Sequence, residues 1–143
     1  MNVENFEELE SVETGLSPGD NIKAGEKIIE RRLHVAGFVV DYMYKYEFRG
    51  HQVAIDLIKY RVSPGNGRSK GKLYNYFLGA PYFSFIGGRV TDKAVQNGQW
   101  QSKIYGQVLN QRPGDGIIVQ IEYQVDTPGG DPPKESTSFK LLD

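Results

Sequence analysis

The chain contains no cysteine among its 143 residues. Disulfide bonds, thiolate metal sites and cysteine nucleophiles are therefore excluded. No stretch approaches the roughly 18 consecutive apolar residues that indicate a membrane-spanning helix, and no Asn-x-Ser/Thr glycosylation acceptor occurs. The sequence therefore predicts a protein that does not insert into a membrane and that needs no oxidising compartment in order to fold.

The N-terminal segment lacks the basic start and the apolar stretch of a signal peptide. We therefore expect intracellular synthesis without a signal peptide. The first 20 residues also lack Lys and Arg but hold six of the 18 acidic residues. The rest of the chain carries all 17 basic residues and a net charge of about +5. This asymmetry predicts an acidic arm that pairs with the basic body or with a basic partner; a solubilising tail is the alternative.

The motifs of nucleotide binding and catalysis are missing. The glycine-rich segment 65–72 fails the phosphate-loop pattern, because Asn66 occupies the position of the first glycine and Leu73 follows Gly71-Lys72. The only histidines, His34 and His51, have no carboxylate cluster at ligand spacing. No serine lies in a nucleophile elbow. We therefore expect a non-enzymatic protein with no catalytic residues, no cofactor and no metal.

The clearest pattern that is present is an alternation of period two. Every even position from Phe38 to Phe48 is aromatic or β-branched, and the positions between them are mostly polar. This alternation is typical of a long strand with one buried face. Further strands are expected at 28–35, 52–62, 73–78, 82–86, around Val90, and at 136–142. A loop is expected at 63–72, and a turn or bulge at Gly87-Gly88. Residues 100–110 and 117–126 are expected to form a second hairpin.

Details of the first hairpin follow from the same pattern. The apolar phase changes near Leu57, which predicts either a β-bulge there or burial of both faces of the strand. If the turn lies at Gly50-His51, Asp41 is expected opposite Tyr60, and Asp56 opposite Lys45 in a cross-strand ion pair. The fold prediction is an all-β antiparallel sandwich or barrel of about seven to nine strands with a long central hairpin. Residues 1–27 are expected to be the arm, and 28–143 a single domain.

Two surfaces are candidate binding sites. Basic residues beside Tyr74 and Tyr76 match the needs of a single-stranded nucleic-acid binder; they are Lys59, Arg61, Arg68, Lys70 and Lys72. The alternative is a solvated hairpin loop whose tyrosines face the core. The second candidate is a cavity for a small apolar ligand or glycan, lined by Tyr42, Tyr44, Tyr46, Trp100 and Tyr105. Its alternative is a packed aromatic core.

The arm supplies the leading functional hypothesis. Apolar residues recur in it at three-residue spacing, typical of a short amphipathic helix that docks on a partner; they are Val3, Phe6, Leu9 and Val12. Together with long strands, they predict a structural protein that forms homo-oligomers through strand edges and the arm. Viral and phage structural proteins share this outline by architectural analogy, so copies of itself or other structural subunits are the expected partners and a virion the expected location. Nucleic-acid binding and ligand or glycan binding are the alternatives.

Overall fold

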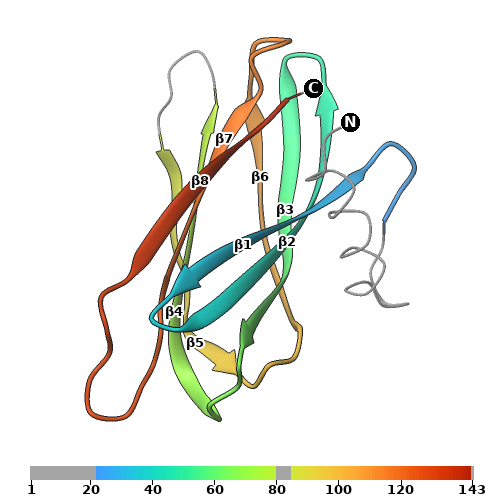
Figure 1. The fold of residues 1–143 in the computed structure, drawn as a ribbon. Helices are drawn as coiled ribbons and strands as arrows, with labels where there is room; N and C mark the ends of the chain where they lie inside the picture. The colour runs from blue at the N-terminus through green and yellow to red at the C-terminus, as the bar shows by residue number, and fades with distance from the viewer. Residues whose placement is uncertain (1–21, 80–84, 143) are drawn as a thin grey trace.

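The computed structural model describes residues 22–79 and 85–142, which form a sandwich of two four-stranded antiparallel sheets (Figure 1). Sheet A has the order β1 (Lys27–Val35), β2 (Phe38–Arg49), β3 (Gln52–Ser63) and β6 (Gln101–Asn110). Sheet B has the order β5 (Phe85–Gln96), β4 (Arg68–Gly79), β7 (Ile117–Gln124) and β8 (Glu135–Leu141). The all-β prediction is confirmed, and the architecture is a sandwich.

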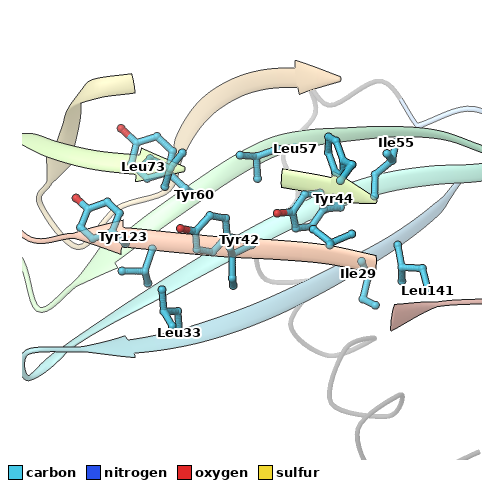
Figure 2. Packing of buried hydrophobic residues seen from close by; sticks show 14 of the residues in the cluster. Ile29, Leu33, Tyr42, Tyr44, Ile55, Leu57, Tyr60, Leu73, Tyr123 and Leu141 are labelled. Carbon is cyan, nitrogen blue, oxygen red and sulfur yellow. The ribbon is translucent and has the colours of Figure 1, made fainter. Parts of the chain in front are cut away.

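The core lies between the two sheets and is rich in aromatic residues (Figure 2). Val40, Tyr42 and Tyr44 of β2 are fully buried, as the alternation predicts. The opposite wall comes from β7, whose inward residues are all buried and were expected to share one face; they are Ile117, Val119, Ile121 and Tyr123. Each sheet therefore buries one face against the other, which is how a sandwich satisfies period-two patterning.

The predicted bulge is present in the β2–β3 hairpin. Tyr44 pairs with Leu57 and Met43 pairs with Lys59, so Ile58 is the additional residue on β3. Lys45 faces Asp56 as expected, and their Nζ and Oδ2 atoms lie 4.0 Å apart. The expected pairing of Asp41 with Tyr60 is wrong, because Asp41 faces Arg61. The inserted residue shifts every pair beyond it by one position.

The second predicted hairpin does not form. Strand β6 pairs with β3 in sheet A, whereas β7 lies between β4 and β8 in sheet B. The connecting segment crosses from one sheet to the other, and buried Gln111 holds it in place. The Gln111 backbone N–H donates to the carbonyl of His51 at 2.8 Å, and its Oε1 accepts from the backbone N–H of Gly116 at 3.2 Å. Turn chemistry alone therefore predicted the wrong strand partner.

Strands β4 and β5 are longer than the sequence indicates. The predicted loop at 63–72 is shorter, since β4 already begins at Arg68. Gly87-Gly88, expected to be a turn or bulge, and the strand around Val90 both belong to continuous β5. A Cβ on Gly87 would lie 2.2 Å from the backbone oxygen of Asn75. Glycine is needed there because the two strands approach closely, and not because the chain turns.

Candidate functional site

The outer face of sheet A carries charged residues that pair with one another across strands. Asp41 is 4% exposed and lies between two arginines of the neighbouring strands. Its Oδ1 accepts from Arg32 Nε at 2.8 Å, and its Oδ2 from Arg61 Nη2 at 2.9 Å. The Arg61 guanidinium also lies 4.5 Å from the ring centroid of Trp100. In this row two guanidinium groups share one buried carboxylate, and the two ion pairs join β1, β2 and β3.

The adjacent row holds Glu30 of β1, which faces Met43 of β2, which in turn faces Lys59 of β3. Burial, with a smaller contribution from the charge of Asp41, raises the pKa of Glu30 to about 7. A carboxyl group with such a pKa is a common feature of acid–base sites. Met43 and Lys59 beside it are buried, however, so this row does not offer an open approach to a substrate. We interpret the shifted pKa as a consequence of packing.

A network of buried polar residues anchors the loop between β3 and β4. Gln96 is fully buried, and its Oε1 accepts from the Tyr123 hydroxyl and from the backbone N–H of Asp126, each at 2.9 Å. Its Nε2 donates to Asn66 Oδ1 and to the backbone oxygen of Asp126, also at 2.9 Å. Buried polar groups with all their partners present fix one local structure. No spacing in the sequence indicates this network, because its members lie on β5, on and after β7, and in the loop between β3 and β4.

The structure separates the basic residues that the sequence grouped together. Lys59 and Arg61 lie on the outer face of sheet A, and both belong to the packed rows just described. Arg68 donates from Nε to Asp126 Oδ1 at 2.9 Å, so it belongs to the loop anchor. Lys70 and Lys72 lie on β4 in sheet B. The five residues therefore do not form one continuous surface.

The two tyrosines near these residues point outward. On β4, Leu73, Asn75 and Phe77 are fully buried, so Tyr74 and Tyr76 between them belong to the outer face of sheet B. Both tyrosines are only partly buried. The alternative in which alternation places them in the core is therefore wrong. The alternation correctly grouped the residues that share a face, but the prediction placed the wrong one of the two faces in the core.

The aromatic residues considered as a ligand cavity occupy different environments. Tyr42 and Tyr44 lie in the core, and their rings are parallel with centroids 6.5 Å apart. The Tyr42 hydroxyl donates to the carbonyl of Glu122 at 2.8 Å, and the Tyr44 hydroxyl donates to Asn75 Oδ1. Burial raises the pKa of both tyrosines well above the usual value. The structure therefore places these two side chains as packed core residues.

The remaining members of that set lie apart. Tyr46 and Tyr105 pack against the edge of the core, and Trp100 stacks on Arg61 at the outer face of sheet A. His34 and His51 are both exposed. Among residues 22–79 and 85–142, no group of three or more His, Cys, Asp and Glu side chains could hold a metal ion. The same residues include no helix that is long and apolar enough to cross a membrane.

Strand β6 presents apolar side chains to solvent at the edge of sheet A. Ile104 is 77% exposed and Val108 is 59% exposed. Both point to the outer face, because along β6 they alternate with Tyr105 and Leu109, which pack into or against the core. Beyond its pairing with β3, no strand that the structure describes pairs with β6. An open strand edge with exposed apolar residues is a template for pairing with another chain.

The proposed anchors of the arm, Val3, Phe6, Leu9 and Val12, lie outside the described residues. Comparison with known proteins adds no relative: no protein-family model, curated protein or solved structure matches the chain.

Proposed function

We propose that this chain is a non-enzymatic structural subunit that assembles with copies of itself through the β6 edge. The observation that carries the proposal is the pair of exposed apolar side chains, Ile104 and Val108, on an open strand edge. Folding alone gives no reason to expose them, because the inward residues of β6 already supply its contacts with the core. The expected participation of the N-terminal arm and a place in a viral or phage particle stay predictions from the sequence.

The sequence of β6 suits pairing with an identical strand. Ile104 and Val108 are equally distant from Gly106 along the strand. If two β6 strands pair antiparallel about a two-fold axis at Gly106, each Ile104 faces Val108 of the second copy, and like charges do not face each other. Such an isologous contact closes into a dimer and joins the two A sheets into one. Main-chain hydrogen bonds would supply affinity, and the apolar pairs would fix the register.

Light scattering after size exclusion, over a range of protein concentrations, tests the proposal. We expect the wild-type chain to form dimers, and Val108→Lys to remain monomeric, because a lysine on an edge strand opposes pairing. Leu142→Lys is the matched control, since Leu142 is 57% exposed but follows the end of β8. A wild-type monomer at every concentration would overturn the proposal, as would equal loss of assembly in both variants.

Introduced cysteines test the register, because the chain has no cysteine of its own. Mild oxidation of a mixture of Ile104→Cys and Val108→Cys chains should give a cross-linked dimer. Either variant alone should cross-link poorly, because identical positions would lie about 14 Å apart along the paired strands, beyond the reach of a disulfide. Equal cross-linking of each variant alone and of the mixture would rule out this register without ruling out assembly.

A further inference from the structure

The outer face of sheet B combines exposed cations with two aromatic rings. On β4, Lys72, Tyr74 and Tyr76 occupy successive outward positions. Along a strand such positions are about 6.8 Å apart. This spacing is twice the roughly 3.4 Å rise between stacked bases, so the two positions match the separation needed by rings that lie on either side of one base.

The strands beside β4 complete this surface. On β5, exposed Arg89 is level with Tyr74. On β7, Gln124 is level with Lys72, and Gln120 is level with Tyr76. On β8, three exposed polar residues continue the rows, namely Ser136, Ser138 and Lys140. We call this surface the Tyr74 face, defined by Lys72, Tyr74, Tyr76, Arg89, Glu122 and Lys140.

The charge of the Tyr74 face is positive after its internal pairing is counted. Its acidic residue, Glu122, already accepts from Gln120 Nε2 at 3.1 Å and pairs with Lys134 Nζ at 3.3 Å. Lys72, Arg89 and Lys140 have no ion-pair partner within the described part of the chain. The Lys134 ammonium lies 4.7 Å from the ring centroid of Tyr74, so a cation already lies against an aromatic ring there.

We propose that the Tyr74 face binds single-stranded nucleic acid. Lys72, Arg89 and Lys140 would contact phosphates, and Tyr74 and Tyr76 would stack on bases. The amides of Gln120 and Gln124 would hydrogen-bond base edges. This continuous surface takes the place of the five basic residues that the sequence grouped together. Binding to it does not depend on assembly through β6. An acidic protein would match the charge, but it would not require two stacking rings at this spacing.

Fluorescence anisotropy with labelled oligothymidine and oligouridine tests binding, from about 20 to 200 mM salt. We expect affinity to fall steeply as salt rises. Tyr74→Ala should weaken binding about fivefold to a hundredfold, the range expected for one lost base stack. The charge reversal Arg89→Glu with Lys140→Glu should weaken binding further. Measurements are made in the wild-type and in the Val108→Lys chain, so that loss of assembly is separated from loss of binding.

The matched control reverses two exposed charges elsewhere, Lys27→Glu with Arg112→Glu, and produces the same change in net charge. Circular dichroism and thermal melts confirm that each variant is folded. Equal weakening by both double variants would show a net-charge effect and overturn the proposal. The proposal would also be overturned if a heparin fragment or an acidic peptide bound tightly and Tyr74→Ala left both this binding and oligonucleotide binding unchanged. Absence of oligonucleotide binding at about 20 mM salt would overturn it as well.

Discussion

The two outer faces of the sandwich use charge in different ways. On sheet A, Asp41 is buried between Arg32 and Arg61, and Lys45 lies within 4.0 Å of both Glu26 and Asp56. On sheet B, Lys134 and Glu122 form an ion pair, whereas Lys72, Arg89 and Lys140 have none among the residues that the structure describes. The charged groups named on sheet A are engaged in ion pairs with one another, whereas three cations of sheet B are directed to solvent.

This difference separates side chains that the fold requires from those that it leaves available. A buried carboxylate needs its partners, because an unpaired charge away from water is costly. Exposed lysines and arginines contribute little to stability, so their gathering around two outward tyrosines needs another reason. Conversely, the basic residues on sheet A are poor candidates for a ligand, since a ligand would have to replace ion pairs that already exist.

The largest expected effect comes from removing the central charge on sheet A. Asp41→Ala should lower the free energy of unfolding by about 2 kcal/mol, because it leaves two adjacent guanidinium groups without their shared carboxylate. This loss is smaller than that expected for a fully buried ion pair, because the side chains of Arg32 and Arg61 are 57% and 29% exposed and water screens their charges. Urea denaturation measures the change.

Lys72→Ala on sheet B is the matched comparison and should change the free energy of unfolding by less than about 0.5 kcal/mol. Equal destabilisation of the two variants would show that the charged side chains on sheet A do not stabilise the fold more than those on sheet B. If Asp41→Ala were neutral, the cluster on sheet A would not be stabilising the fold.

A change of pH is expected to have a smaller effect on the free energy of unfolding. The pKa of Glu30 is raised to about 7 in the folded chain, above the ordinary value near 4.5. Between these values the folded state holds a proton that the unfolded state has released, so stability should fall as pH rises from about 4.5 to about 7. The loss should be about 1 kcal/mol, because partial exposure screens the interaction.

Urea denaturation across this pH range measures the slope for the wild-type chain and for Glu30→Gln. The variant removes the titrating group and should flatten the slope, while the remaining carboxylates contribute equally to both proteins. Identical slopes would show that Glu30 titrates near its ordinary pKa in the folded state.

The sequence predicted the fold well because its strongest signals are local. Alternation from Phe38 to Phe48 and the phase change near Leu57 are both properties of one strand, and both are confirmed. Which strand pairs with which depends on contacts distant in the sequence. The segment between β6 and β7 has the composition of a hairpin loop but crosses between sheets. Glycine and proline there indicate a change of direction without indicating the destination.

The candidate sites were harder to predict, because they depend on which face of a strand is buried. Tyr74 and Tyr76 alternate with Leu73, Asn75 and Phe77, so both faces of β4 are equally aromatic or polar by sequence. Asn75 is fully buried, and its amide oxygen accepts a hydrogen bond from the Tyr44 hydroxyl. Likewise, exposed Ile104 and Val108 are as apolar as a buried face would be. Only the packing of the second sheet decides such cases.

The remaining comparison is between Tyr42, which is buried in the core on sheet A, and Tyr74, which lies on the outer face of sheet B. Tyr42→Phe should lower the free energy of unfolding by about 1 kcal/mol, because it removes a buried hydroxyl that donates to the carbonyl of Glu122 at 2.8 Å. Tyr74→Phe should change it by less than about 0.5 kcal/mol, because Tyr74 lies on the outer face. Urea denaturation measures both variants. Equal costs would indicate that the Tyr74 hydroxyl has a structural role, and would weaken the distinction between a core tyrosine and one left available to a ligand.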